Sequence, residues 1–240
     1  MAWLGHATVL LEHGGVRLLT DPVLRSRLVH LRRHGEAPTV PERIDAVLLS
    51  HLHYDHLDLP SLKLLPGDVR VLAPEGAGTV LRAAGVVNVV ELAPGDAVDV
   101  SGLRIEATPA EHDDRRRPLG PRATPIGFVV RARPSVYFAG DTGMFPGMGD
   151  LAPVDLALLP VAGWGPTLGP GHMDAAEAAE AAALLRPAVA VPIHWGTLHP
   201  RGRRRGAWFH GPPHEFAARV AELAPDVDVR ILEPHGSLEL

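Results

Sequence analysis

The sequence predicts an α/β fold in which mixed sheets carry helices on their outer faces. Two observations indicate this class. Short apolar runs that end at Gly or Pro turns recur along the chain as predicted strands, and they outnumber the helical patterns. Some neighbouring runs are separated by tight turns, as in hairpins, and others by an amphipathic helix, as in crossovers. No linker or repeat interrupts the sequence, so we expect residues 1–240 to form a single domain.

The predicted strands share apolar character and turn residues at their ends. In chain order they cover residues 8–11, 16–20, 46–49, 69–73, 86–92, 97–100, 103–108, 126–131, 135–139, 156–160, 188–193 and 227–232. A His-Gly-Gly turn joins the first two of these strands, so we expect a hairpin there. Strands 126–131 and 135–139 are close enough in sequence to form another hairpin. The runs 156–160 and 188–193 are apolar throughout, which indicates buried strands.

Three helices are predicted outside the sheets. Residues 77–84 have a short helical pattern that ends at a glycine. Asp174 can cap a helix that ends at residue 185, and Glu177 stands at the position that completes a capping box. Residues 213–223 carry the remaining amphipathic pattern. We expect these helices to pack against the sheets.

Composition excludes several classes of function. The chain has no Cys, so disulfides, thiolate ligands and thiol nucleophiles are excluded. The net charge of -5 gives no general attraction to nucleic acid or to anionic membranes. The sequence shows neither a secretory signal pattern nor an apolar run long enough to span a membrane. We therefore expect a cytoplasmic protein that acts on a small molecule.

Four potential metal ligands lie within six residues, in the order His51, His53, Asp55 and His56. They directly follow the predicted strand 46–49, so they belong to the loop at its carboxyl end. Neutral imidazoles and carboxylates are ligands for zinc and similar divalent ions. Four such groups are more than one tetrahedral site needs from a single segment. The cluster therefore indicates two metals side by side.

Three further candidate ligands stand where predicted strands end. His112, Asp141 and His194 each follow an apolar run within a turn marked by Gly or Pro. Sites are often built at such strand ends, because the scaffold is rigid and the loops can vary. A single His or Asp after a strand is usually a turn residue or a cap. Four such loops together, with the cluster included, favour a metal site.

These residues resemble the ligand set of hydrolases with the metallo-β-lactamase fold. The motifs at residues 3–8 (WLGHAT), 139–142 (AGDT) and 192–197 (PIHWGT) resemble one branch more closely. That branch contains ascorbate-phosphate lactonases and the phospholipase D that hydrolyses N-acyl-phosphatidylethanolamine. The resemblance covers nearly the whole chain. It implies a four-layer αββα sandwich with the metals at one edge, between the two sheets.

The resemblance assigns each candidate ligand to a metal. The first metal would be held by His51, His53 and His112, the second by Asp55, His56 and His194, and Asp141 would bridge the two. The implied activity is that of a dinuclear metal-dependent hydrolase, in which hydroxide between the metals cleaves an ester-type bond. Zinc is the expected metal from the ligand types, with manganese or iron as alternatives.

Another use of the same fold also fits the ligand pattern. The chain could be a non-hydrolytic metal-binding module or a di-iron redox protein. Redox di-iron relatives usually carry Glu where this chain has His53, and a degenerate module should have lost ligands, so hydrolysis is favoured. Relatives in the resembling family are often dimers, which leaves a homo-oligomer possible.

Asp55 and His172 are the predicted catalytic residues. His172 lies on a Gly- and Pro-rich loop before the helix at Asp174. In the resembling branch a His at this place lies in the active site, where it could polarise the substrate or protonate the leaving group. The alternative is a helix-end residue without chemistry. His199 is a weaker candidate of the same kind.

Residues around the predicted ligands are candidates for supporting roles, because a metal-bound His usually donates its other N–H to a carboxylate or carbonyl. These candidates are His6, Asp21, Asp58 and Glu111. We expect His6 and Asp21 to support the site and Glu111 to be solvated. For Asp58, a cap of the following helix is an equal alternative.

Arginines near the ligand loops predict a cationic rim for a small anionic substrate, such as a phosphodiester or a phosphorylated lactone. They are residues 115–117, residues 203–205 and Arg25, Arg27, Arg32 and Arg33. The alternative is a solvated surface on an Arg-rich chain. Trp164 and Leu168 are expected to line the pocket or to pack beneath it. We expect residues 23–31 to form a packing helix, with a lid or a lipid contact as the alternative.

Overall fold

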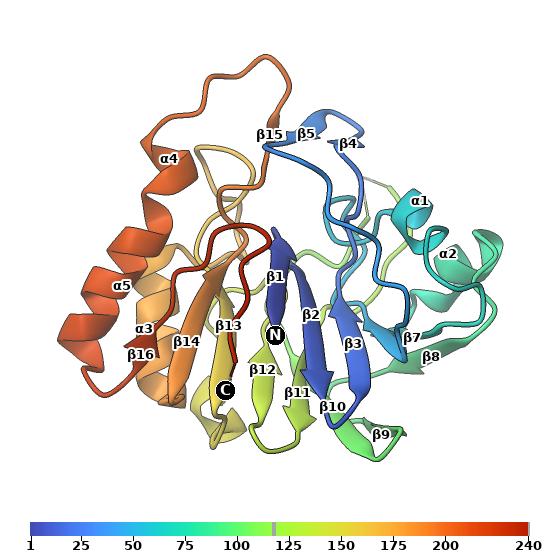
Figure 1. The fold of residues 1–240 in the computed structure, drawn as a ribbon, viewed down its shortest axis with the longest axis horizontal. Coiled ribbons are helices and arrows are strands. Elements are labelled where there is room, and N and C mark those ends of the chain that lie inside the picture. Colours follow the sequence, from blue (N-terminus) through green and yellow to red (C-terminus); the bar gives the residue numbers. More distant parts are fainter. Residues whose placement is uncertain (117–118, 240) are drawn as a thin grey trace.

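A computed structural model describes residues 1–116 and 119–239 of the chain. Two large sheets lie face to face, and helices cover their outer sides (Figure 1). The first sheet has the order β1-β2-β3-β6-β7-β8. Its strands are β1 (Ala2–Gly5), β2 (Thr8–His13), β3 (Val16–Thr20), β6 (Ala46–Leu48), β7 (Arg70–Pro74) and β8 (Val89–Leu92).

The second sheet has the order β16-β14-β13-β12-β11-β10-β9. Its strands are β9 (Ala97–Val100), β10 (Leu103–Pro109), β11 (Ile126–Arg131), β12 (Val136–Phe138), β13 (Leu156–Pro160), β14 (Val189–Ile193) and β16 (Asp228–Val229). A small third sheet has the order β15-β5-β4, formed by β4 (Arg27–Leu28), β5 (Leu31–Arg33) and β15 (Leu198–Pro200). Figure 1 places this small sheet at the top, above the two large ones.

Helices lie on both outer sides, so the predicted four-layer α/β arrangement is confirmed (Figure 1). The helices are α1 (Leu59–Leu62), α2 (Gly78–Ala83), α3 (Ala175–Leu185), α4 (Ala207–His210), α5 (Pro212–Leu223) and the 3-10 helix η1 (Met148–Leu151). Helices α1 and α2 lie beside the first sheet, and α3 and α5 pack on the second. None of the helices in residues 1–116 and 119–239 has the length and apolar character that a bilayer crossing requires.

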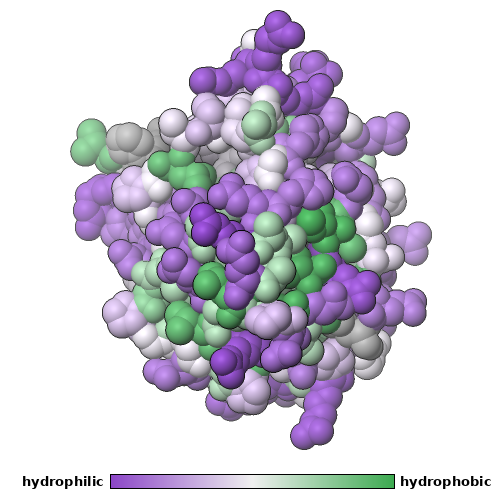
Figure 2. Space-filling model, turned by 90° about the vertical axis from the view of Figure 1, so that its left-hand side faces the viewer, coloured by the Kyte–Doolittle hydropathy of each residue, from purple (hydrophilic) through white to green (hydrophobic). Residues whose placement is uncertain are grey.

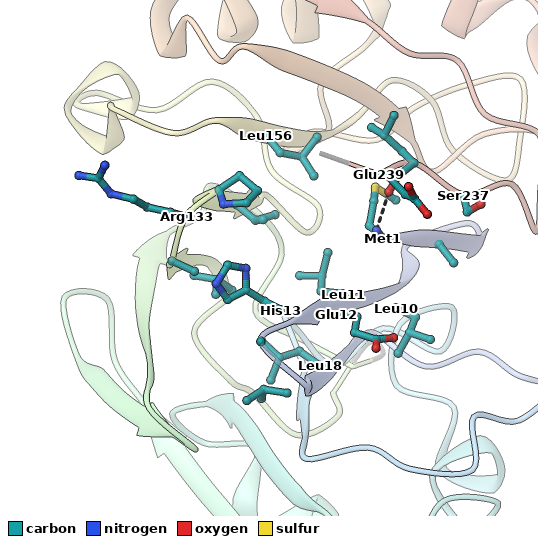
Figure 3. Close-up of a pocket in the computed structure, with 18 residues that line it drawn as sticks. Met1, Leu10, Leu11, Glu12, His13, Leu18, Arg133, Leu156, Ser237 and Glu239 are labelled. Atoms are coloured by element: carbon teal, nitrogen blue, oxygen red, sulfur yellow. Dashed lines mark hydrogen bonds between the residues drawn. The ribbon is translucent and has the colours of Figure 1, made fainter.

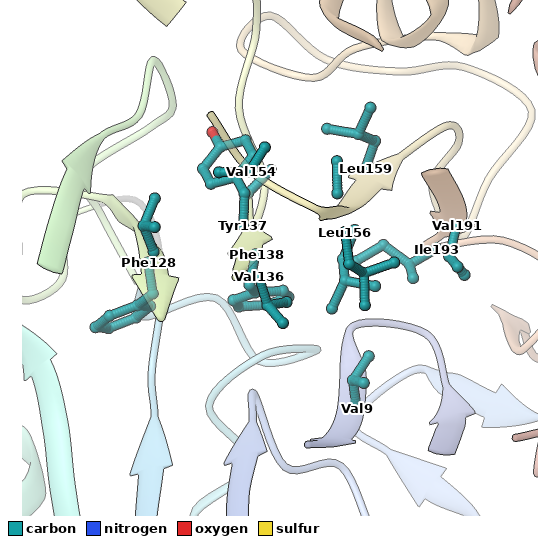
Figure 4. Packing of buried hydrophobic residues seen from close by; sticks show 14 of the residues in the cluster. Val9, Phe128, Val136, Tyr137, Phe138, Val154, Leu156, Leu159, Val191 and Ile193 are labelled. Atoms are coloured by element: carbon teal, nitrogen blue, oxygen red, sulfur yellow. The ribbon is translucent and has the colours of Figure 1, made fainter. Parts of the chain in front are cut away.

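The main core lies between the two large sheets. Along β12, Val136 and Phe138 point toward the first sheet and Tyr137 toward the opposite face, as strand alternation requires (Figure 4). Val9 comes from the first sheet and faces the second (Figure 4). Phe138 and Val9 are fully buried, and such side chains each contribute about 1.5–3 kcal/mol through burial. The two sheets are therefore held in fixed register, and this rigidity extends to the loops at their ends.

Strand direction explains where a site can form. In the first sheet β3, β6 and β7 run parallel, and in the second sheet β12, β13 and β14 run parallel. Parallel strands present all their carboxyl ends at one edge of a sheet. The loops that follow β6, β12 and β14 therefore lie at one edge of the sandwich, together with the loop after β10, since β10 runs in the same direction as β12. These loops carry the predicted ligands.

Most predicted elements are confirmed with small changes at their ends. The capping box at Asp174 is present, because its side chain accepts from Glu177 N at 2.9 Å while Glu177 Oε2 accepts from Asp174 N at 3.1 Å. The hairpins β2–β3 and β11–β12 are antiparallel as predicted. The predicted strand 227–232 is wrong in length, because β16 covers only Asp228–Val229 at the edge of its sheet.

The helix expected over residues 23–31 is wrong. The segment contains the hairpin β4–β5, with Val29 in the turn at a φ of 37°. Leu28 and Leu31 are buried with Val23 and Leu198 in a small core of their own. This packing favours two extended pieces, because both leucines then face the same side of the small sheet. β1, β15, α4 and η1 were not predicted, since each is at most four residues long.

Candidate metal centre

The predicted ligands form two groups at the sandwich edge. Ligand atoms of His51, His53 and His112 all lie within 4.8 Å of one another. His51 and His53 stand on the loop after β6, whereas His112 follows β10 in the opposite sheet. The ring centroids of His51 and His112 are 4.5 Å apart, and those of His53 and His112 are 4.7 Å apart. Three imidazoles from two sheets therefore converge without a carboxylate among them.

The second group contains Asp55, His56 and His194, together with His6. Asp55 Oδ2 lies 3.6 Å from His56 Nε2 and 3.6 Å from His194 Nε2. The two Nε2 atoms of His56 and His194 are 3.0 Å apart. His194 follows β14 and reaches the loop of β6 from the opposite sheet.

Asp141 stands between the two groups. Its carboxylate lies 3.0 Å from His56 Nε2 and 3.2 Å from His194 Nε2. It also falls within 4.8 Å of ligand atoms of His112 and His172. Asp141 is 2% exposed, yet neither carboxylate oxygen makes a well-oriented hydrogen bond. Both oxygens therefore point into the space that the two groups share.

The outward ring nitrogens of these histidines are held by the protein. His112 Nδ1 donates to Gly171 O at 2.7 Å, and His194 Nδ1 donates to Ala162 O at 2.7 Å. His56 Nδ1 lies 2.7 Å from Asp21 Oδ2, and His51 Nδ1 lies 2.9 Å from Ser50 Oγ. Such contacts set the tautomer that leaves the other nitrogen free for a metal. For these four rings, the free nitrogen is Nε2 and it faces the centre.

These observations fit bound metal cations. Unpaired buried acceptors are rare in native proteins, and His51 Nε2 and both oxygens of Asp141 are buried without a partner. Imidazole nitrogens also approach one another within hydrogen-bond distance, as at 3.0 Å between His53 Nδ1 and His112 Nε2. Borderline and hard divalent ions are the species that accept such nitrogen and oxygen donors together. The described residues therefore contain His/Asp groups that could hold metals.

The two groups of the centre differ in the pKa values of their histidines. Burial lowers the pKa of His51 well below its usual value and lowers the pKa of His112 to about 4. Burial would also lower the pKa of His194, but the Asp141 carboxylate outweighs it and raises that pKa to about 9. The pKa of His56 is likewise raised against burial by Asp141 and Asp55. Without metal, burial therefore favours neutral imidazoles in the first group, whereas the neighbouring carboxylates favour protonation of His56 and His194 in the second.

Backbone strain is concentrated at the centre. His6, Asp21 and His194 have positive φ angles of 56°, 30° and 65°. For residues other than glycine this left-handed region costs about 1–2 kcal/mol. Each of the three residues directly follows a strand and turns its side chain into the site. Such strain typically persists only where surrounding structure enforces it, and it is common at functional sites.

Gly140 permits the close approach of the two sheets beside Asp141. Its φ is +64°, and a Cβ placed there would lie 2.6 Å from Ser50 Cβ. Ser50 N in turn donates to Asp21 Oδ1 at 2.7 Å. A side chain at position 140 would therefore push apart the loops that carry Asp141 and the cluster at 51–56.

The residues predicted to support the site differ in whether they contact it. Asp21 is fully buried and binds Ser50 and His56, and His6 Nε2 lies 2.9 Å from Asp55 Oδ2, so both contact the site as expected. Asp58 is a helix cap that accepts from Ser61 N at 3.1 Å, and it also pairs with Arg25 at 2.6 Å. The side chain of Glu111 is exposed.

His172 lies beside the predicted metal ligands, whereas His199 does not. His172 Nε2 is 3.4 Å from Asp141 Oδ2, and its ring centroid is 4.5 Å from that of His112. Burial would lower the pKa of His172, but the nearby carboxylate of Asp141 raises it above the usual value. His199 lines a different cavity beside the small sheet, so its candidacy for the metal site is wrong.

A pocket of about 240 Å³ opens over the candidate metal centre. Trp164 and Leu168 line it, which was one of the two predicted roles for these residues. The wall also contains His30, Leu31 and Tyr54, which no motif marks as pocket residues, and Arg116, which was predicted for the cationic rim. The guanidinium carbon of Arg116 lies 4.3 Å from the Tyr54 ring centroid, and Nη1 donates to Leu52 O at 2.6 Å.

The predicted cationic rim is only partly at this pocket. Of the arginines predicted to form it, Arg116 is the one that lines the pocket among the described residues. Arg32, Arg33 and residues 203–205 line a separate cavity, and Arg25 pairs with Asp58. Arg115 and Arg27 line neither cavity. Arg117 lies outside the described residues.

Another cavity shares no lining residue with the pocket over the candidate metal centre. It has a volume of about 730 Å³ and is lined by Met1, Glu12, His13, Arg133 and Glu239, among others (Figure 3). None of its lining residues belongs to the groups that could hold a metal. Chemistry that needs metals therefore belongs to the smaller pocket.

Known proteins and one family model match nearly the whole chain or most of it. Residues 16–195 match the family model described as a beta-lactamase superfamily domain. A protein from Methanopyrus kandleri, described as a UPF0173 metal-dependent hydrolase, is 38% identical over 100% of this chain and 99% of its own length. A relative from Opitutus terrae with that description is 34% identical over the same shares. A metallo hydrolase structure from Ignicoccus hospitalis has a TM-score of 0.75 and 26% identity, covering 98% of this chain and 95% of its own.

Proposed function

The chain belongs to the beta-lactamase superfamily, and on that premise we propose that it is a dinuclear metal-dependent hydrolase that cleaves an ester-type bond. The placement of Asp141 carries this proposal. Its two buried oxygens have no hydrogen-bond partner and lie between three imidazoles on one side and the group of Asp55, His56 and His194 on the other. One shared carboxylate between two ligand groups suits two cations close together.

Each group of ligands has a distinct part in the proposed centre. We assign His51, His53 and His112 to one cation, and Asp55, His56 and His194 to the other. When bound, the cations supply an acidified water and a positive charge for the oxygen of the scissile bond. Zinc is the preferred ion for imidazole-rich sites, and manganese and iron remain to be tested.

The chain's own residues position the reaction. His6 holds Asp55 through the 2.9 Å contact of its Nε2, and Asp21 fixes the ring of His56. His172 lines the pocket and its pKa is raised above the usual value, so it holds a proton more readily than a free imidazole and can give it to the leaving oxygen. Its Nδ1 donates to Gly169 O at 3.1 Å, which sets the direction of the ring.

The pocket wall supports a small substrate with an anionic group. A volume of about 240 Å³ is below the range of about 300–1,000 Å³ that is common for drug-sized ligands. Tyr54, Trp164 and Leu168 give the wall apolar surface, and Arg116 supplies a cation. We therefore propose a small phosphodiester or phosphorylated lactone as the substrate class.

A substrate screen tests the proposed function. The protein is loaded in turn with zinc, manganese or iron and assayed against lactones, phosphodiesters, phosphomonoesters and β-lactams. We expect turnover of a lactone or a phosphodiester, loss of that turnover with a chelator, and recovery when the metal is restored. An optical spectrum that responds to O₂ in the iron form, with no hydrolysis of any panel member, would contradict hydrolysis and support a redox function.

A further inference from the structure

We propose that a second cavity, formed beside the small sheet, binds a small polyphosphate anion. This basic cavity has a volume of about 520 Å³. It is lined by β5 with the two residues after it, by His199 on β15, and by the arginines at 203–205. Its lining contains five arginines and two histidines and no acidic residue.

The cavity is built on ordered elements. β5 and β15 pair antiparallel, with Arg32 directly opposite His199. Phe209 is 1% exposed and meets the ring of His34 edge-on at 5.7 Å and that of His199 at 5.8 Å. A two-stranded ladder and a buried aromatic ring therefore fix both imidazoles. Only the arginines at 203–205 come from the loop between β15 and α4.

The positive charge of this cavity has no counterpart in the described chain. Arg33 is 3% exposed and donates only to two backbone carbonyls, Leu4 O at 3.0 Å and Val23 O at 2.6 Å. Its Nε is buried without a partner. Among residues 1–116 and 119–239, no carboxylate forms an ion pair with any of the five arginines. The guanidinium of Arg33 lies on the buried face of β5, whereas Arg32 and residues 203–205 are exposed. The unpaired charges of these four exposed arginines favour a bound anion.

Arg205 and His34 contact each other at the wall of the cavity, with the guanidinium as the donor. Arg205 Nη1 contacts His34 Nδ1 directly. Burial, and then the charge of Arg205, lower the pKa of His34, as a region of positive potential requires. Like charges in a concave site focus the field and attract counter-ions of opposite sign.

The number and kind of cations favour a ligand with several phosphate charges. Guanidinium groups match phosphate oxygens through paired N–H donors. A single monoanion would leave most of the four exposed arginines unneutralised, whereas linked phosphates can contact several at once. Figure 2 shows hydrophilic residues covering the top of the molecule, where Figure 1 places the 201–206 loop, so a ligand in solution can reach this end.

This inference does not rest on the proposed hydrolysis. The basic cavity and the metal pocket share no lining residue. They are neighbours because His30 and Leu31 line the metal pocket while the next residues of the same strand, Arg32 and Arg33, line the basic cavity. Binding to the cavity can be measured without any substrate turnover.

Calorimetric titration with inorganic pyrophosphate at fixed ionic strength tests the site in the metal-loaded protein. We compare Arg204→Glu with Arg219→Glu, which makes the same charge change on the exposed side of α5. We expect Arg219→Glu to bind like the unchanged protein and Arg204→Glu to bind roughly tenfold more weakly or worse, since a charge-assisted contact is lost. Arg32→Glu on β5 should give the same loss.

The variants also distinguish binding in the basic cavity from binding at the metals. Both glutamate variants keep every proposed metal ligand, so pyrophosphate bound at the metals would weaken equally in both and would overturn the inference. Equal affinities for orthophosphate and pyrophosphate would overturn the claim of several phosphate contacts. ADP serves as the other probe: affinity equal to pyrophosphate supports recognition of the phosphates alone, and tighter binding supports a nucleotide as their source. Thermal melting checks that the variants are folded.

Discussion

Asp141 links the two sheets through the contacts of its carboxylate. It follows β12 in the second sheet, yet its nearest imidazoles include His56 on the loop of the first sheet. Removing its charge would leave His56 and His194 facing a neutral group at 3.0 and 3.2 Å. The proposed pair of cations therefore depends on the carboxylate of this residue.

His172 is the residue that separates binding from turnover. We expect His172→Ala to keep both metals, because its imidazole is not among the seven proposed ligands, and to lower kcat about 10²–10⁴-fold through loss of a proton donor. Metal content by mass spectrometry and kcat on the best substrate of the screen measure the two effects. His214→Ala, on the exposed face of α5, is the matched control. Unchanged kcat in His172→Ala would remove this residue from the mechanism.

Protonation predicts how metal uptake depends on pH. A metal-bound imidazole must be unprotonated, and the raised pKa of His56 and the pKa of His194 of about 9 mean that both hold protons at neutral pH without metal. The lowered pKa values of His51, His53 and His112 leave the other group unprotonated there. Affinity of the second position should therefore rise with pH from neutrality to about pH 9, while affinity of the first should stay flat.

Titration of metal into chelator-treated protein, in two buffers of different ionisation enthalpy, measures the protons released. We expect protons to be released at neutral pH only when metal binds at the second position, whose affinity is weaker and depends on pH. The same raised pKa affects the stability of the metal-free fold. Protonated His194 stabilises this fold fully below about pH 6.5, the pKa of the unfolded chain, and the stabilisation is lost as pH rises through about 9. Absence of proton release at neutral pH would contradict this assignment of charge.

At the scale of elements, the turn after β12 packs closely against the loop that carries Ser50. We expect Gly140→Ala to lower the free energy of unfolding by about 2–4 kcal/mol, from the positive φ and the clash with Ser50 together. Gly14→Ala is the matched control, because Gly14 has a φ of +56° and no atom within 4 Å of its missing Cβ. Thermal or denaturant unfolding measures both. Equal losses would show that the contact with Ser50 contributes nothing.

Elements with strong local signals were predictable, and elements that depend on distant contacts were not. The helix from Ala175 to Leu185 carries its own cap, so its start could be read from Asp174 and Glu177. The hairpin β4–β5 has no such signal, because Leu28 and Leu31 become core residues only when Leu198 packs against them. A segment of alternating Arg and apolar residues resembles an amphipathic helix until that distant partner is known.

At the scale of the whole molecule, residue patterns predicted mixed sheets with outer helices and the loops that carry candidate ligands, and the family resemblance predicted the four layers. Consecutive ligands at 51–56, and one candidate after each of three later strands, are enough to locate the edge where these strands end. The division of arginines between two cavities was not predictable. That division depends on β5, which places Leu31 and Arg32 in the walls of different cavities, and β5 itself depends on pairing with β15.

The metal content of the protein after exhaustive dialysis, with and without Asp141→Asn, tests the shared carboxylate most directly. We predict two divalent ions per chain in the unchanged protein and fewer than one in Asp141→Asn, with the fold intact by circular dichroism. One ion or none in the unchanged protein, or two ions retained by Asp141→Asn, would contradict the bridging assignment.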